Sequence, residues 1–142
     1  MAAGKPVHIL LVDDDDVDVM AVQRALRAKK VVNTMSVAHD GLEALAMLRG
    51  QGAATPVPRP YVILLDLNMP RMDGIEFLHE LRKDPDHQQA IVFVLTTSKA
   101  APDKKAAYDE HVAGYIVKSN IGNDFCEVMT LLDCYWRIVE FP

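Results

Sequence analysis

Residues 9–16 read ILLVDDDD and residues 61–66 read YVILLD. Each stretch joins an uninterrupted apolar run to one or more acids placed directly after it. Runs without polar residues at alternate positions are typical of strands covered on both faces, and hence of a parallel sheet. Five apolar runs are found along the chain, of which the first is broken only by His8 and the second is weaker, with polar residues among its four apolar ones: Val7–Val12, Val31–Val37, Tyr61–Leu65, Ile91–Leu95 and Tyr115–Val117.

Amphipathic stretches separate these runs. Apolar residues at three- and four-residue spacing predict helices over Val17–Ala28, Gly41–Leu48, Ile75–Arg82, Pro102–His111 and Asp124–Val139. Two of these helices open on the D-x-x-E pattern of a capping box, Asp40 with Glu43 and Asp124 with Glu127. The alternation of strands and helices predicts an α/β layer fold with right-handed crossovers.

Composition limits the class of protein. The chain has 142 residues, of which 50% are hydrophobic and 25% charged, with a net charge of −5 at pH 7, which is typical of one globular domain. The acidic balance argues against nucleic acid or an anionic membrane as a main partner. Since no apolar run is long enough for a membrane span or a signal-peptide core, the expected compartment is the cytoplasm.

Two further features have a plain interpretation. Cys126 and Cys134 do not make a disulfide framework, and both are expected to be core-like thiols. The stretch GQGAATPVPRP at residues 50–60 is rich in Gly and Pro. It is expected to be a surface connector, with a partner-docking loop as the alternative.

Polar side chains follow four of the five runs. The first run is followed by Asp13 and Asp14, the third by Asp66, the fourth by Thr96 and the fifth by Lys118. In an open parallel sheet, ligands bind beyond the carboxyl ends of the strands, near the point where the strand order reverses. We therefore expect these carboxylates, the hydroxyl and the ammonium to meet in one site.

A cluster of Asp13, Asp14 and Asp66 needs a compensating charge. Two carboxylates about 4 Å apart repel each other by several kcal/mol at an effective dielectric of about 20, so the cluster demands a cation or shifted pKa values. Oxygen ligands without His or Cys favour Mg²⁺. The other acids of the first run are expected to be a solvated helix start, where acids suit the helix dipole: Asp15, Asp16 and Asp18.

Together these pieces resemble the receiver domain of two-component response regulators. The resemblance covers about residues 7–140 and is carried by ILLVDDDD (9–16), LLDLNMPRMDG (64–74), VLTTS (94–98) and YIVKS (115–119). It implies a doubly wound, flavodoxin-like sheet in the order 2-1-3-4-5 within a single receiver domain, residues 1–142. It also implies a protein that takes a phosphoryl group from a histidine kinase and catalyses only its own phosphorylation and dephosphorylation.

The resemblance implies roles for the residues at the metal and the acceptor. Asp66 would accept the phosphoryl group and, with the other acids, bind Mg²⁺. Asp14 would be a direct metal ligand, whereas Asp13 would act largely through water. Asn68 would offer its backbone carbonyl to the metal.

The resemblance also implies roles for residues around the phosphoryl group. The Thr96 hydroxyl and the Lys118 ammonium would bond its oxygens, and Tyr115 would be the aromatic switch that follows Thr96. Most receivers have a proline after this lysine, at a cis bond, whereas this chain has Ser119. A cis bond without proline costs about 2.5–4 kcal/mol, so the loop at this position is expected to differ.

Lys118–Ser119 also points to one subgroup, the stand-alone regulators served by phytochrome-type histidine kinases. The Pro-rich stretch before Tyr61 and the ending CYWRIVEFP resemble that subgroup too. No output domain is expected, so signalling would run by protein contact or phosphorelay. The alternative is a receiver fragment of a larger transcription regulator.

The last predicted helix carries two apolar stripes. One stripe suffices to cover a sheet: Phe125, Val128, Met129, Leu132, Trp136 and Val139. The second stripe needs another cover, for which a homodimer is the simplest source, with isolated exposed apolar residues as the alternative: Leu131, Cys134, Tyr135 and Ile138.

Two other functions are compatible with this fold class. A phosphatase of the aspartyl-phosphate kind usually needs a second acid two residues after the nucleophile, where this chain has Asn68. A flavin-binding electron carrier would need a hydroxyl-rich loop after the first strand. Here that loop is acidic and would repel phosphate.

Overall fold

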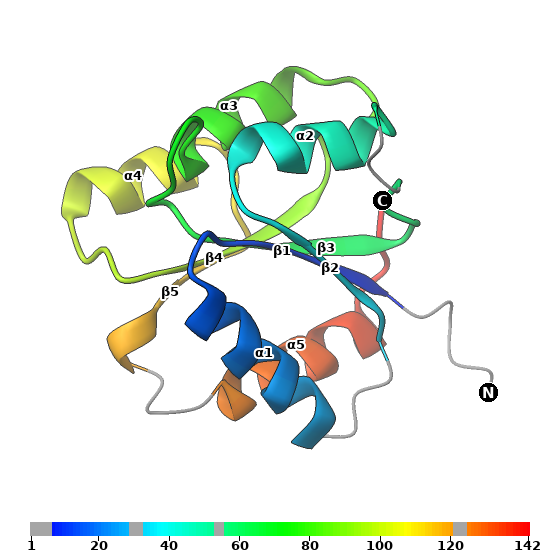
Figure 1. The fold of residues 1–142 in the computed structure, drawn as a ribbon, viewed down its shortest axis with the longest axis vertical. Helices are drawn as coiled ribbons and strands as arrows, with labels where there is room; N and C mark the ends of the chain where they lie inside the picture. The colour runs from blue at the N-terminus through cyan, green and yellow to red at the C-terminus, as the bar shows by residue number, and fades with distance from the viewer. Residues whose placement is uncertain (1–6, 29–32, 53–55, 121–124) are drawn as a thin grey trace.

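The computed structural model describes residues 7–28, 33–52, 56–120 and 125–142. At its centre lies a five-stranded parallel sheet in the order β2-β1-β3-β4-β5 (Figure 1). The strands are β1 (His8–Val12), β2 (Met35–Ala38), β3 (Tyr61–Leu65), β4 (Ile91–Thr96) and β5 (Gly114–Val117). The predicted doubly wound order is confirmed.

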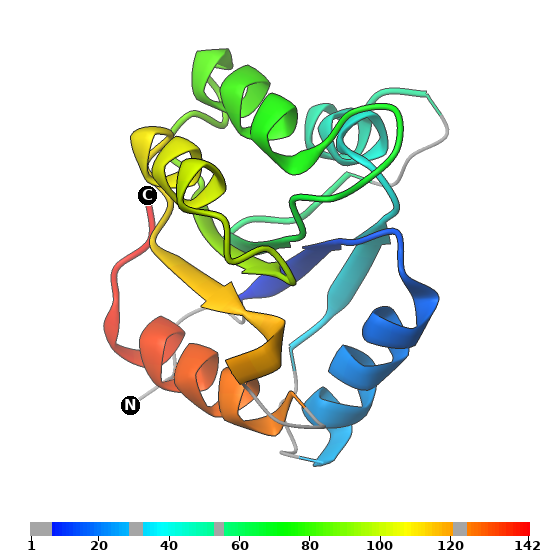
Figure 2. The same cartoon turned by 90° about the vertical axis from the view of Figure 1, so that its left-hand side faces the viewer.

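Helices cover both faces of the sheet. They are α1 (Asp16–Ala28), α2 (Gly41–Arg49), α3 (Gly74–Lys83), α4 (Ala101–Asp109) and α5 (Cys126–Ile138), with a short 3-10 helix, η1 (Lys118–Asn120), directly after β5. Helices α1 and α5 lie on one face, and α2, α3 and α4 lie on the other (Figure 2). The strand order reverses between β1 and β3, which places the topological switch point at their carboxyl ends.

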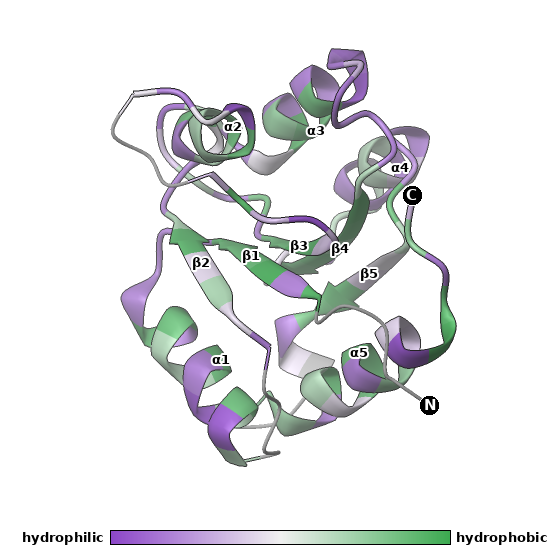
Figure 3. Cartoon of the chain, turned by 90° about the vertical axis from the view of Figure 1, so that its right-hand side faces the viewer, coloured by the Kyte–Doolittle hydropathy of each residue, from purple (hydrophilic) through white to green (hydrophobic). Residues whose placement is uncertain are grey.

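The two faces explain the uninterrupted apolar runs. Leu10 and Ile63 belong to the core cluster under α2, α3 and α4, whereas Ile9, Leu11 and Val62 belong to the cluster under α1 and α5. Successive strand residues therefore enter opposite cores, because side chains alternate across a strand. Figure 3 shows the resulting apolar sheet between helices whose outer faces are more polar.

Helix starts differ in part from the sequence patterns. The Asp40 side chain accepts the Glu43 N–H at 2.9 Å, as expected of a cap. The Glu43 carboxylate lies 3.5 Å from Nδ1 of His39. A full capping box forms at Asp73 and Glu76, which start α3. The capping box expected at Asp124 lies outside the described residues.

Several predicted boundaries shift. Strand β2 begins at Met35, and the earlier part of the predicted run, from Val31, lies partly outside the described residues. In the loop of residues 50–60, Gly50 adopts a left-handed φ of +63° and ends α2, and Val57 is buried in the core. None of the described helices has the length and apolar character that a bilayer crossing requires.

The two cysteines differ in burial. Cys126 is half-buried and packs against the core under α1 and α5, whereas Cys134 is exposed on the outer side of α5. The prediction of a core-like thiol is therefore wrong for Cys134. The reason is helical geometry, because an offset of eight residues rotates the side chain by about 80° around a helix of 3.6 residues per turn.

Candidate functional site

Backbone hydrogen bonds extend the sheet by one residue into the site. The Asp13 N–H donates to the Ala38 carbonyl, and the Asp66 N–H donates to the Val12 carbonyl, each at 2.9 Å. Both aspartates therefore keep the register of their strands and lie side by side at the switch point. Both are buried, Asp13 at 1% and Asp66 at 7% exposure.

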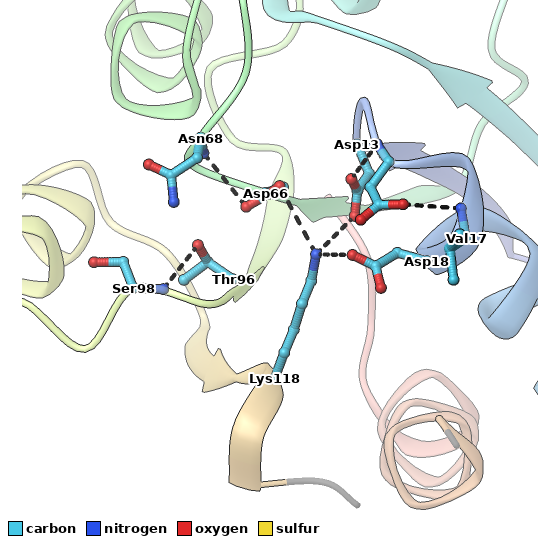
Figure 4. Close-up of polar contacts among 9 residues, drawn as sticks. Asp13, Val17, Asp18, Asp66, Asn68, Thr96, Ser98 and Lys118 are labelled. Atoms are coloured by element: carbon cyan, nitrogen blue, oxygen red, sulfur yellow. Dashed lines mark hydrogen bonds and ion pairs between the residues drawn. The ribbon is translucent and has the colours of Figure 1, made fainter. Parts of the chain in front are cut away.

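Lys118 brings a cation to these carboxylates. It begins η1 directly after β5, and its side chain is only 10% exposed. Its Nζ lies 3.0 Å from Oδ2 of Asp13, 2.5 Å from Oδ2 of Asp18 and 3.8 Å from Oδ2 of Asp66 (Figure 4). The ammonium therefore stands among three carboxylates from three elements.

Burial and pairing set the protonation of this cluster. Burial raises the pKa of Asp13 to about 6, although hydrogen bonds from the Asp15 N–H and from Lys118 oppose the rise. Burial alone would lower the pKa of Lys118, but hydrogen bonds to Asp18 and Asp13 outweigh it, so that pKa is raised. Lys118 is a fixed positive charge, and the site holds more acid than one cation balances.

The acids can hold a metal ion. Asp13, Asp14 and Asp66 each offer a carboxylate oxygen within 4.8 Å of the others. Asp13 and Asp66 are buried and Asp14 is exposed, so the group opens to solvent on one side. An all-oxygen set with excess negative charge fits a hard divalent cation.

The neighbouring loops supply hydrogen-bond donors and a hydroxyl. The Asn68 N–H donates to Oδ1 of Asp66 at 3.3 Å. Thr96, at the end of β4, is fully buried, and its Oγ1 accepts the Ser98 N–H at 3.3 Å. Figure 4 shows Thr96 and Lys118 on the side of the site nearest β4 and η1.

Tyr115 is tied to the loop that follows Thr96. Its hydroxyl donates to the Ser98 carbonyl at 3.0 Å, and its ring lies 6.5 Å from that of Tyr108 in α4. The ring is only half-buried. A change at Thr96 can therefore reach Tyr115 through two residues of backbone.

The loop after Asp66 packs tightly against α3. A Cβ on Gly74 would lie 2.6 Å from the Asp66 carbonyl oxygen and 2.7 Å from Cα of Leu67, so only glycine fits at this point. In the same loop, Arg71 has a φ of +63° and its Nε donates to Oδ2 of the buried Asp40 at 2.7 Å. These contacts fix the segment that carries Asn68.

The bond after Lys118 differs from the usual arrangement. In the described ranges the one cis peptide bond joins Arg59 to Pro60, so the bond between Lys118 and Ser119 is trans. Lys118 nevertheless reaches the site. A different loop at this position, expected from Ser119, is therefore compatible with the position of the ammonium.

Sequence reasoning missed Asp18. Asp15 and Asp16 are exposed, as expected for a helix start, but Asp18 is only partly exposed and contacts Lys118. The prediction of a solvated acid is therefore wrong for Asp18. Its place in the first turn of α1 could have indicated this, because helical side chains lean back toward the helix N-terminus, which here meets the sheet edge.

The outer face of α5 carries part of the predicted second stripe. Leu131 and Ile138 are 52% and 84% exposed, and Cys134 is exposed beside them. Tyr135 instead lies at the boundary, since its ring packs edge-to-face on Phe93 at 5.1 Å between centroids. Three of the four residues thus form an apolar strip open to solvent.

Two curated proteins are similar to this chain over most of their length. Response regulator Rcp1 of Synechocystis sp. is 39% identical over 134 residues, which cover 94% of this chain and 91% of Rcp1. The probable methanogenesis regulatory protein FilR2 of Methanothrix harundinacea is 32% identical, over 96% of this chain and 87% of FilR2.

Solved structures extend the likeness to three dimensions. The Mn²⁺-bound form of Rcp1 superposes with a TM-score of 0.84 at 38% identity, covering 96% of this chain and 99% of that one. The phosphorylated cyanobacterial phytochrome response regulator RcpA gives a TM-score of 0.83 at 34% identity, with the same coverage. The sequence model of the response regulator receiver domain family matches residues 9–130, which include every acid of the cluster. This chain belongs to the response regulator receiver family.

Proposed function

We propose that Asp66 accepts a phosphoryl group from a phosphohistidine of a histidine kinase and that the chain signals through the resulting change of state. The observation that carries the proposal is the buried Asp66 carboxylate, placed beside two further acids and 3.8 Å from a lysine ammonium. This arrangement concentrates acid where a cation and a phosphoryl group would balance the charge.

The transfer forms a P–O bond and breaks a P–N bond. An oxygen of Asp66 attacks phosphorus, the P–N bond to the histidine breaks, and the departing nitrogen keeps the electron pair. The product is an acyl phosphate, which water later hydrolyses. The contribution of the chain to this transfer is positioning and electrostatic stabilisation.

The proposed metal is Mg²⁺, held by Asp13, Asp14 and Asp66 with the Asn68 backbone carbonyl. When bound, it would neutralise charge on the phosphoryl oxygens. The Mn²⁺-bound form of Rcp1 supports a divalent ion in a receiver of this kind. Asp13 would act on the metal as a carboxylate, largely through water, and because burial raises its pKa to about 6, protons would compete with the metal below that pH.

Thr96 and Tyr115 are the proposed switch. The phosphoryl oxygens would draw the Thr96 hydroxyl, which now accepts the Ser98 N–H. The loop carrying the Ser98 carbonyl would then shift, and this carbonyl is the partner of the Tyr115 hydroxyl. Tyr115 stands on the edge strand β5, so its movement would alter a surface that a partner protein can distinguish.

The acceptor is tested by intact mass spectrometry after incubation with acetyl phosphate and Mg²⁺. Wild type is expected to gain one phosphoryl group, and Asp66→Asn to gain none. Asp73→Asn is a matched control, because Asp73 lies in the same loop and caps α3. A phosphoryl gain in Asp66→Asn equal to that of wild type would remove the acceptor assignment.

The proposed donor is a phytochrome-type kinase in the cytoplasm. Support comes from RcpA, described as a cyanobacterial phytochrome response regulator, at 34% identity over 96% of this chain. The test is transfer from a phosphorylated phytochrome kinase, with a nitrogen-sensing kinase as control. Transfer that is no faster from the phytochrome kinase would contradict the pairing.

We also propose that two copies of the chain pair through α5. Leu131 and Ile138 are exposed apolar side chains on one helix, and Cys134 lies between them. Sedimentation of Leu131→Asp/Ile138→Asp is expected to give a monomer where wild type gives a dimer. Val17→Asp/Met20→Asp is a matched control on α1, where both apolar residues are also exposed.

A further inference from the structure

Lys118 has three carboxylate partners at unequal distances. Its Nζ lies 2.5 Å from Asp18 and 3.0 Å from Asp13, both hydrogen bonds, but 3.8 Å from Oδ2 of Asp66. The last distance is too long for a hydrogen bond. The ammonium is therefore held by two acids next to the third (Figure 4).

We propose that Asp18 is a positioning residue for phosphoryl transfer to Asp66, because it holds the Lys118 ammonium beside the acceptor without letting it close on the acceptor oxygen. The inference rests on the phosphoryl-acceptor function proposed above. Asp18 lies outside the group of Asp13, Asp14 and Asp66 whose carboxylate oxygens could hold a metal, and its ion pair is with Lys118.

Asp18 is suited to this role by its place in α1. It lies in the first turn of the helix, and its side chain is 23% exposed against 10% for Lys118. The ion pair is thus largely shielded from water, where a charge-assisted hydrogen bond is stronger than on an open surface. It joins two residues 100 positions apart in the sequence and links α1 to η1.

The distance of 3.8 Å between Nζ of Lys118 and Oδ2 of Asp66 affects how well Asp66 can act as a nucleophile. An acceptor oxygen in direct contact with an ammonium would have a lone pair engaged and would be a weaker nucleophile. At 3.8 Å the Asp66 oxygen is free of that contact. An oxygen of a phosphoryl group arriving there would come within reach of the ammonium, which is already in place when charge develops.

The loss of Asp18 should release the ammonium toward Asp66. Asp13 alone would then hold it, and Oδ1 of Asp13 is already occupied by the Asp15 N–H at 2.9 Å. The Lys118 ammonium would then divide its contacts between the carboxylates of Asp13 and Asp66. The acceptor would be partly masked before the donor arrives.

The test compares Asp18→Asn with Asp16→Asn. Both remove one negative charge from the first turn of α1, but the Asp16 side chain is 85% exposed and has no contact with Lys118 among the described interactions. With acetyl phosphate and saturating Mg²⁺, we expect Asp18→Asn to lower the maximal phosphorylation rate about fivefold to tenfold. Asp16→Asn should stay within about twofold of wild type, and Asp18→Glu should recover part of the rate.

Two measurements show whether Asp18 acts through Lys118. In a Lys118→Ala background, adding Asp18→Asn should cause no further loss of rate, because the group that it positions is gone. NMR titration of the Lys118 side chain should give a lower pKa in Asp18→Asn than in Asp16→Asn. This second measurement needs no phosphorylation and also reports that the variants are folded.

Three results would overturn the inference. They are equal rates for Asp18→Asn and Asp16→Asn, a slowing by Asp18→Asn that persists without Lys118, and an unchanged Lys118 titration. If wild type gained no phosphoryl group at Asp66, the proposed function would fail instead. The titration would still decide whether Asp18 holds the lysine.

Discussion

The two ends of the sheet bury polar side chains in opposite ways. At the carboxyl ends, Asp13 and Asp66 are buried next to each other and share Lys118 with Asp18. At the amino ends, buried or half-buried polar groups have neutral hydrogen-bond partners: hydroxyls for His8 and backbone carbonyls for Arg82. The first region holds unbalanced charge, whereas the second holds satisfied hydrogen bonds.

The amino end shows what a purely structural polar cluster looks like. Both ring nitrogens of the buried His8 contact hydroxyls, at 2.6 Å from Thr34 and 2.7 Å from Ser36. The Tyr61 hydroxyl lies 2.6 Å from Nδ1 of His87. The Arg82 guanidinium donates to four backbone carbonyls: those of Gln88, Ala90, Glu110 and His111.

This difference separates stability from function. Satisfied hydrogen bonds stabilise the fold, and their loss leaves a buried group without a partner. Clustered like charges destabilise it and are kept where a ligand compensates them. Changes at the amino end should therefore cost stability alone, and changes at the carboxyl end should mainly cost phosphorylation.

Lys118→Ala should have the largest effect on activity. Without the ammonium, the developing phosphoryl charge loses a donor, and the phosphorylation rate with acetyl phosphate should fall about a hundredfold. Lys105→Ala is the control, because its ion pair with Asp109 on α4 is exposed. A Lys118→Ala rate close to that of Lys105→Ala would break the distinction between the two ends.

Among the substitutions proposed here, Arg82→Ala should cause the largest decrease in the free energy of unfolding. It removes the donor for four carbonyls that tie α3 to the ends of α4 and of the loop before β4. The free energy of unfolding in urea should fall by about 2–3 kcal/mol, with the phosphorylation rate unchanged. Arg49→Ala, which breaks the partly exposed pair with Asp84, should cost less than about 1 kcal/mol.

Two results would contradict a purely structural role of Arg82. Arg82→Ala could prove no less stable than Arg49→Ala, or it could slow phosphorylation as Lys118→Ala is expected to do. The first result would mean that the four carbonyls find water. The second would mean that the amino end reaches the site.

His8 gives a smaller, pH-dependent effect. Burial lowers its pKa below the ordinary value of 6.5, so the folded chain holds fewer protons than the unfolded chain as the pH drops below that value. The contribution of His8 to the free energy of unfolding should therefore be fully present above pH 6.5. It should be lost as the pH falls through the pKa of the folded chain. In His8→Gln this slope should be shallower, as measured by urea unfolding across that range. Equal slopes would show that His8 is not held neutral.

Much of the fold and the site follows from the sequence. Apolar runs predict the parallel sheet, and the charged residues directly after three of them indicate its carboxyl edge, so Asp13, Asp66 and Lys118 follow from their place at strand ends. Asp18 does not, because it lies in a predicted helix and not at a strand end, and the five acids between residues 13 and 18 look alike in a sequence.

The α5 stripes show a second limit. Tyr135 is three residues after Leu132 and four after Leu131, so helical spacing assigns it equally to the buried and to the exposed stripe. Its contact with Phe93, from a strand 42 residues earlier in the sequence, decides the matter. A pattern confined to one helix cannot contain that contact.

Chemical trapping of the acyl phosphate identifies the residue that carries the phosphoryl group. The chain is incubated with acetyl phosphate and Mg²⁺, treated with borohydride, which reduces an aspartyl phosphate to homoserine, and digested for peptide mass mapping. We expect homoserine at residue 66 and at no other aspartate. Reduction at Asp13 or Asp14, or a phosphoryl gain that leaves residue 66 unreduced, would contradict it.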